Sequence, residues 1–173
     1  MMELGAHAPS ALEWRQESMK RRFYELKGGD STYGTLRFMT AFGSLAEAES
    51  SEGKWTFKRR GFFSPNIGAR RTGSEEDVLV YTPKWTGMKG EIRTTQGERL
   101  AFHSEGFWGQ QWVLASVAGR PLIRFENHGV LRHSSNVTLE PGARERSDLA
   151  LLAGFCWYIL LLHMEDASVT VTT

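Results

Sequence analysis

The 173-residue chain is poor in cysteine and carries almost no net charge. It contains one cysteine, Cys156, so no disulfide can form within the chain. Its net charge is only +1, which excludes a strong overall field toward nucleic acid. No basic stretch followed by an apolar run occurs in residues 1–14, so no secretory signal is expected. These features predict a soluble, cytoplasmic domain with no nucleic-acid partner.

Motifs of catalysis and metal binding are also missing from the sequence. No Gly-x-Ser-x-Gly elbow occurs, and Cys156 lies in an apolar run where burial makes a thiol unreactive. Glu47 and Glu49 alternate along one expected strand face, which is typical of a solvated pair of carboxylates. His128 and His133 are close in sequence, but no cysteine or carboxylate stands at zinc-ligand spacing around them. We therefore expect no catalytic residue, no cofactor and no metal.

Glycine and aromatic residues are abundant, with 18 Gly, 10 Phe and 6 Trp. Three segments share one form, in which a β run is followed by a polar turn with glycine and a second β run. They cover residues 45–57, 91–102 and 112–125. Glycine tolerates the positive φ of hairpin turns, and apolar and polar residues alternate along the runs. The pattern predicts three β-hairpins with one buried face, and further strands over 33–38 and 77–82.

Repeated hairpins leave unpaired backbone at both edges of an open sheet, and closure into a barrel removes these edges. Eight to ten strands are expected before residue 140, which is about the number at which a barrel closes around a filled interior. The predicted fold class is therefore mainly β, a closed antiparallel barrel.

The pattern changes after residue 146, where fourteen residues without a charge run from 149 to 162. They predict a helix over about 147–164, with Ser147 as N-cap, and this helix is apolar all round and hence buried. A bilayer span needs about 20 apolar residues, which disfavours a membrane anchor. The barrel is what we expect to surround the helix. Its expected core residues are Leu149, Leu152, Phe155, Cys156, Trp157, Ile159 and Leu160.

Hairpins followed by an apolar helix resemble the tubby C-terminal-like superfamily, which includes Tubby, the phospholipid scramblases and the LURP-one-related proteins. The resemblance rests on segments 33–38, 53–61 and 149–162 and on the hairpin turn at Gly97. It implies a barrel of about twelve strands around a central helix. We place a lead-in segment at 1–22 and this single barrel domain at 23–173. The resemblance further implies binding of anionic lipid head groups, as in Tubby, or a peripheral place at a membrane.

Two groups of residues are candidates for binding. The candidate anion site consists of the basic residues Lys58, Arg59, Arg60, Arg70 and Arg71. A guanidinium group can bind two phosphate oxygens at once. Acidic residues 75–77 follow closely and are the alternative partners of these cations. The intervening loop supplies a second group.

That second group is Phe62, Phe63 and Ile67, an apolar loop between the two halves of the basic cluster. Exposed, these side chains would form a patch for a partner or a membrane, whereas packed they would plug one barrel end. We favour the plug. A further aromatic turn is expected where Gly106 and Gly109 enclose Phe107 and Trp108.

Three functions remain open at this stage. The first is a non-catalytic binding or scaffold protein whose candidate partners are a phospholipid head group or another protein. The second is a lipocalin-like carrier of a small apolar ligand, which needs an empty barrel interior. The third is a tail-anchored membrane protein. The place of the 149–162 helix separates the first two.

Overall fold

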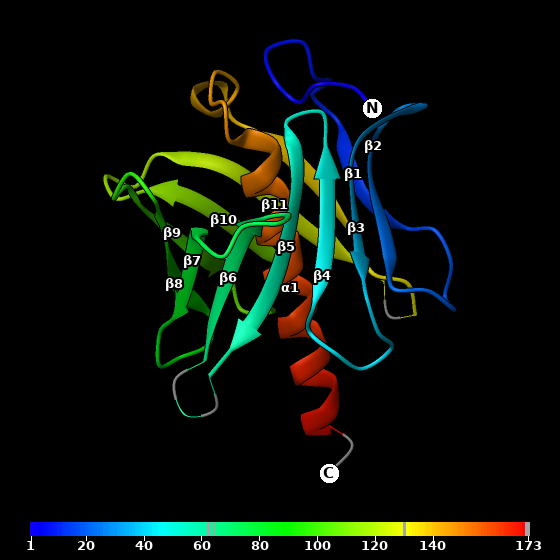
Figure 1. Ribbon diagram of the computed structural model, residues 1–173, viewed down its shortest axis with the longest axis vertical. Helices are drawn as coiled ribbons and strands as arrows, with labels where there is room; N and C mark the ends of the chain where they lie inside the picture. Colours follow the sequence, from blue (N-terminus) through cyan, green and yellow to red (C-terminus); the bar gives the residue numbers. More distant parts are fainter. Residues whose placement is uncertain (62, 64, 130, 172–173) are drawn as a thin grey trace.

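The computed structural model describes residues 1–61, 63, 65–129 and 131–171. Among these residues twelve strands precede a short 3₁₀ helix, η1 (Pro141–Ala143), and one long helix, α1 (Leu149–Val171) (Figure 1). The strands are β1 (Leu12–Gln16), β2 (Phe23–Gly28), β3 (Ser31–Phe38), β4 (Ala46–Ser50), β5 (Gly53–Arg60), β6 (Asn66–Arg71), β7 (Asp77–Pro83), β8 (Lys89–Thr94), β9 (Arg99–Glu105), β10 (Gln111–Ser116), β11 (Pro121–His128) and β12 (Ser134–Leu139).

Each strand pairs antiparallel with its neighbour in the chain, and β12 pairs with β1 to close the barrel. Leu12 lies opposite Val137 and Trp14 opposite Ser135 in this closing pair. The three hairpins expected from glycine turns are β4–β5, β8–β9 and β10–β11, and Gly97 and Gly119 have the positive φ that such turns require. The prediction of a closed antiparallel barrel is confirmed.

Helix α1 runs through the middle of the barrel, as predicted, and residues 149–162 are all buried. Aromatic side chains of helix and wall interlock: the Trp157 ring stacks 6.2 Å from that of Trp14, and Phe155 meets Phe57 edge-on at 5.3 Å. By length and composition α1 is apolar enough to cross a membrane, but 72% of its most apolar window is buried inside the barrel. The all-round apolar character of the helix is therefore explained by the barrel wall.

Two boundaries differ from those expected. Strand β1 lies inside the proposed lead-in segment 1–22, so the barrel begins at Leu12; five residues with two inward side chains give too short an alternation to recognise. Helix α1 continues to Val171, past the expected end at 164. Its first charged residues, Glu165 and Asp166, lie within the helix and do not follow its end. Glu165 pairs with Arg22 at 2.6 Å and Asp166 with Arg59 at 2.6 Å, which holds the outgoing turn against the barrel rim.

The barrel has two distinct ends, because the connections of an up-and-down barrel alternate between them. We call the end where α1 begins the entry end; it also carries the loops β2–β3, β4–β5, β6–β7, β8–β9 and β10–β11. The exit end, at the bottom of Figure 1, carries the C-terminal turns of α1 and the loops β1–β2, β3–β4, β5–β6, β7–β8, β9–β10 and β11–β12.

Candidate functional site

The barrel interior is occupied by side chains of the helix and the strands. The expected core residues Leu149, Leu152, Phe155, Cys156, Trp157, Ile159 and Leu160 are all buried there. Burial raises the pKa of the Cys156 thiol well above its usual value, which keeps it protonated and unreactive. A function of the described residues must therefore lie on the outer wall or at the two ends.

The five cations of the predicted anion site do not converge. Lys58 lies exposed on the outer wall, whereas Arg59 binds Asp166 of the helix at the exit end. Arg60 and Arg70 share the carboxylate of Asp77, and Arg70 also binds Glu75 at 2.9 Å. The alternative partners, the acidic residues just downstream, account for these two arginines.

The charge of this shared carboxylate is fixed by its neighbours. Burial alone would raise the pKa of Asp77, but hydrogen bonds from Arg60 and Arg70 hold it below its usual value. Arg71 lies apart from the others, 6.0 Å from the Trp55 ring centre, and lines a cavity at the entry end. The cluster is thus divided between wall and ends, and it forms no single anion site.

The residues expected to plug the barrel are not all placed alike. Ile67 is buried in β6, but the Phe63 ring is almost fully exposed at the exit end. Phe62, the third residue of that group, lies outside the described residues. The plug is α1 itself, whose last buried residue, Leu162, lies just before the exit rim.

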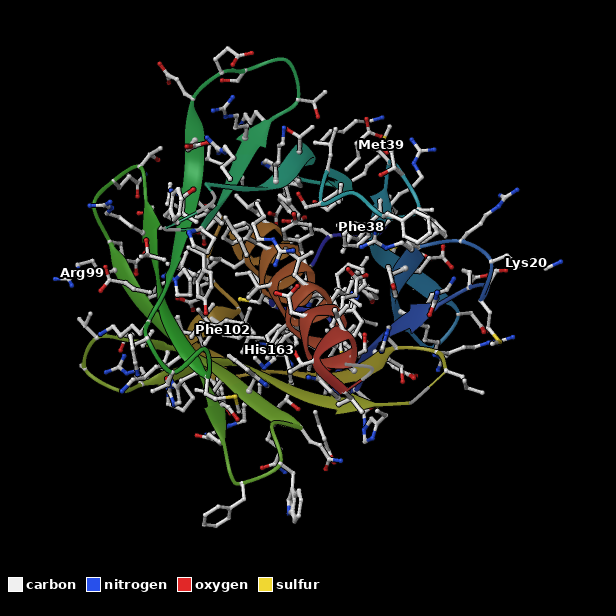
Figure 2. The ribbon with its side chains drawn as sticks, turned by 90° about the horizontal axis from the view of Figure 1, so that it is seen from below. Lys20, Phe38, Met39, Arg99, Phe102 and His163 are labelled. Carbon is white, nitrogen blue, oxygen red and sulfur yellow. The ribbon has the colours of Figure 1, made fainter. Side chains whose placement is uncertain are left out.

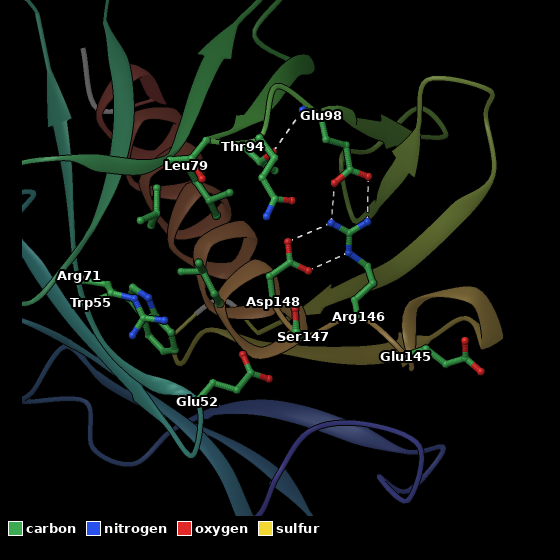
Figure 3. Close-up of a pocket in the computed structure, with 14 residues that line it drawn as sticks. Glu52, Trp55, Arg71, Leu79, Thr94, Glu98, Glu145, Arg146, Ser147 and Asp148 are labelled. Carbon is green, nitrogen blue, oxygen red and sulfur yellow. Dashed lines mark hydrogen bonds and ion pairs between the residues drawn. The ribbon is translucent and has the colours of Figure 1, made fainter.

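A cavity of about 580 Å³ at the entry end lies beside the first turn of α1 (Figure 3). Arg146 joins Glu98 and Asp148 there, with nitrogen–oxygen distances of 2.7 to 2.9 Å. The Asp148 carbonyl accepts the first helical hydrogen bond, from the Leu152 amide. The expected N-cap, Ser147, is not the cap that the helix uses.

The cap of α1 comes from the turn between β4 and β5. The Ala150 amide donates to Oε1 of Glu52 at 3.2 Å, which satisfies one of the free amides of the first turn. Burial raises the pKa of Glu52 to about 7, although the amides of Ala150 and Leu151 favour its charged form. No local pattern indicates this contact, because Glu52 and Ala150 lie 98 residues apart in the chain.

This raised pKa predicts a stability that falls as pH rises. Between about pH 4.5 and 7 the folded state holds a proton on Glu52 that the unfolded chain has lost, so raising the pH favours unfolding. Glu52→Gln keeps an acceptor oxygen without the charge. We expect the free energy of unfolding of the variant, relative to wild type, to rise by about 1 kcal/mol between pH 5 and 8, after allowance for solvent screening.

Urea unfolding at both pH values measures this difference, and groups other than Glu52 cancel in the comparison. Glu145→Gln is the matched control, since Glu145 lines the same cavity but is exposed. A variant-minus-wild-type difference that is the same at pH 5 and 8 would contradict the assignment of Glu52 as a half-buried cap.

The exit end differs from the entry end in its apolar side chains. All six exit loops carry at least one exposed large apolar residue, and the rings of Phe42, Trp85 and Phe107 are fully exposed. Figure 2 looks onto this end, with α1 at the centre and the loops around it. We call the following set the apolar crown: Met19, Phe42, Phe63, Trp85, Phe107, Trp108 and Leu131. In the entry loops the corresponding exposed residue is Val117, and in the segment before β1 Met1 and Met2 are also exposed.

Charge is divided between the two ends as well. The exit loops contain five cations and one acid, Glu17; the cations are Lys20, Arg21, Arg22, Lys84 and Arg132. The entry connections contain three cations, Arg120, Arg144 and Arg146, against the acids Asp30, Glu52, Glu75, Glu76, Glu98, Glu140, Glu145 and Asp148. The C-terminal part of α1 adds two acids to the exit end, Glu165 and Asp166, which leaves five cations against three acids there. The small net charge of the chain therefore conceals a mildly basic exit end and an acidic entry end.

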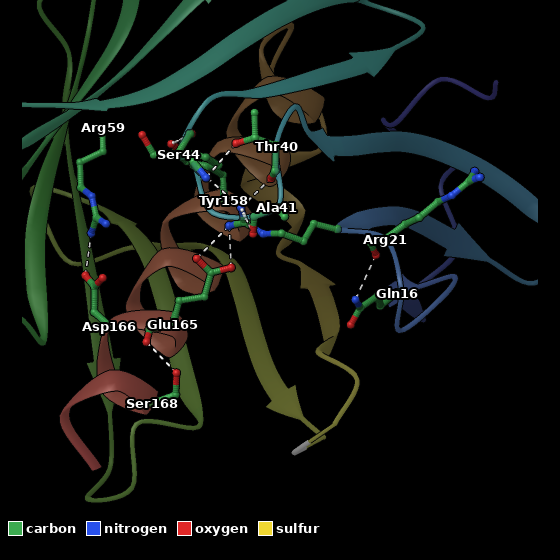
Figure 4. Close-up of polar contacts among 12 residues, drawn as sticks. Gln16, Arg21, Thr40, Ala41, Ser44, Arg59, Tyr158, Glu165, Asp166 and Ser168 are labelled. Carbon is green, nitrogen blue, oxygen red and sulfur yellow. Dashed lines mark hydrogen bonds and ion pairs between the residues drawn. The ribbon is translucent and has the colours of Figure 1, made fainter. Parts of the chain in front are cut away.

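One of these cations joins the exit loops to the helix. Arg22 donates through Nη1 to the carbonyls of Thr40, Ala41 and Gly43, and through Nη2 to both carboxylate oxygens of Glu165. Tyr158 donates to the carbonyl of Ser44 in the same β3–β4 loop (Figure 4). The loops beside this contact are thus held in place by the helix that they surround.

Sequence reasoning identified part of this surface. Phe63 and the turn with Phe107 and Trp108 stood out as aromatic, but Trp85 and Phe42 carried no local signal. Among the described residues no group of three or more His, Cys, Asp or Glu side chains is placed to hold a metal ion. No family model, curated protein or solved structure matches this chain.

Proposed function

We propose that this protein is a non-catalytic barrel that binds the surface of an anionic membrane through its exit end. The observation that carries the proposal is the apolar crown: exposed aromatic and aliphatic side chains occur on all six exit loops. Aromatic side chains at loop tips suit the boundary between head groups and acyl chains. A ring of separate tips fits a flat bilayer better than it fits a compact protein ligand.

The charge distribution supports the same orientation. Basic exit loops are attracted to an anionic leaflet, and the acidic entry end is repelled by it. The helix contributes no anchor, since its apolar length is buried in the barrel. The association is therefore peripheral and reversible, at a cytoplasmic membrane face. The resemblance to the tubby C-terminal-like superfamily stays a prediction, and the proposal does not depend on it.

Flotation with phosphatidylcholine vesicles, with and without phosphatidylserine, tests the proposal. Wild type should float with the anionic vesicles, and less so as salt is raised. Trp85→Ser combined with Trp108→Ser should weaken this binding at least tenfold, or about 1.4 kcal/mol, because two exposed rings lose their apolar contact area. Both side chains are exposed, so the melting temperature should not change.

Val117→Ser is the matched control, since it removes an exposed apolar side chain from the entry end. It should bind vesicles like wild type. The proposal is wrong if wild type fails to float with anionic vesicles, or if the double tryptophan variant floats as well as wild type does.

A further inference from the structure

We propose that a depression at the rim of the exit end binds the phosphate group of an anionic phospholipid. The proposal rests on the membrane docking proposed above and names the lipid group that is recognised. The depression, of about 700 Å³, lies where the β1–β2 loop meets the neighbouring end of β3. Residues 19–23 form one side of it and residues 37–41 the other.

The charged residues that line this rim depression are all basic. They are Lys20, Arg21, Arg22 and Arg37. Arg22 is committed to Glu165 and the loop carbonyls, with its side chain only 16% exposed. In the described part of the chain Lys20 and Arg21 form no ion pair, and both are exposed. These two cations are therefore free to bind an anion from outside.

Arg37 adds a third cation to the depression. It pairs with Glu47 at 2.8 Å, but both side chains are largely exposed, at 60% and 42%. A surface pair of this kind contributes little stability, so a phosphate can replace the carboxylate. An ammonium and two guanidinium groups then surround the phosphate, and the guanidinium groups present paired donors to its oxygens.

When the apolar crown is docked on a membrane, the depression lies at the level of the lipid phosphates. Its walls include the strand ends Phe23 and Phe38, which lie behind the loop tips that carry the crown. Met19 and Met39 belong to the same lining and are exposed, so they can contact the lipid beneath its head group. In Figure 2 Lys20 and Met39 lie on the same side of the central helix. The apolar side chains thus lie at the level of the acyl chains, and the cations lie at the level of the phosphates.

The walls are also fixed before any lipid binds. Arg22 joins the end of β2 to the β3–β4 loop through three carbonyls, and its guanidinium carbon lies 3.6 Å from the centre of the Phe38 ring. The Phe38 amide donates to the Arg22 carbonyl at 2.9 Å. Prior ordering of both walls reduces the conformational entropy that binding would otherwise cost.

Vesicle binding by Lys20→Gln/Arg21→Gln tests the proposal, with Lys58→Gln/Arg93→Gln as the matched control. The control removes the same charge from exposed wall positions on β5 and β8. We expect the rim variant to lose at least fivefold in binding to phosphatidylserine vesicles and to keep the weaker binding of wild type to phosphatidylcholine. The control should stay close to wild type.

Each other result has a defined meaning. Equal losses in rim variant and control would overturn the rim site, because general charge attraction would then account for the preference. An unchanged rim variant beside a wild type that floats would overturn the rim site and leave crown docking intact, whereas a wild type that floats with no vesicle overturns both. Glycerol 3-phosphate is the soluble probe: if it raises the melting temperature of wild type alone while vesicle preference is unaltered, the site takes a soluble phosphate ester and the lipid assignment is overturned.

Discussion

Leu152→Asp should prevent the barrel from folding. Leu152 has no exposed surface and lies on α1 among the inward side chains of the strands. Among the described residues no cation is buried inside the barrel. A carboxylate there must therefore be buried either charged or protonated, at a cost of several kcal/mol in either form. Because most domains are stable by only about 5–15 kcal/mol, the variant should lose its cooperative thermal transition and its near-ultraviolet circular dichroism.

Two further substitutions serve as controls for the size of this effect. Val169→Asp places the same charge on the same helix beyond the barrel, where the side chain is 66% exposed, and should change the free energy of unfolding by less than about 0.5 kcal/mol. Leu152→Ala removes volume without charge and should cost about 2–5 kcal/mol. If Leu152→Asp melted near the wild-type temperature, α1 would not occupy the barrel interior, and an apolar-ligand carrier would again be a serious alternative.

The sequence predicted the barrel and its helix because both depend on patterns that local chemistry enforces. Alternation in the hairpins at Gly97 and Gly119 and the absence of charge over 149–162 each allow few alternatives. The N-terminal strand was missed because Leu12 and Trp14 make an alternation of only two inward residues. The predicted end of the helix was too early, because a charged residue such as Glu165 indicates the end of a buried helix unless its partner, Arg22, is known.

The candidate site was harder to predict, since it depends on which end of the barrel each loop occupies. Lys58 to Arg60 form a run in the sequence, but alternation along β5 places Arg59 toward the helix and its neighbours on the outer wall. Trp85 and Lys20 are 65 residues apart and share an end only because the strand count between them sets the parity of their loops. A missed strand reverses that parity, so only a complete strand assignment could have separated a basic from an acidic end.

Arg22→Met should destabilise the protein by about 2–4 kcal/mol, far more than removal of the other arginine that binds the end of α1. Methionine keeps the length and the apolar contact with Phe38, but it leaves Glu165 and three loop carbonyls without their donor. Arg59→Met is the matched control. Its partner, Asp166, is 58% exposed, so the loss there should be below about 1 kcal/mol.

A double-mutant cycle separates the ion pair from the loop contacts. Glu165→Gln alone removes the charge that Arg22 binds, and the combined variant shows how far the two losses overlap. We expect a coupling energy of about 1–2 kcal/mol from urea unfolding, with the rest of the Arg22 effect due to the carbonyls of Thr40, Ala41 and Gly43. Arg22→Lys should recover only part of the loss, because a compact ammonium group cannot donate to the carboxylate and to the carbonyls at the same time, as the planar guanidinium group does. Similar losses in Arg22→Met and Arg59→Met would show that burial does not distinguish the two pairs, and the account of how the loops are held to the helix would fail.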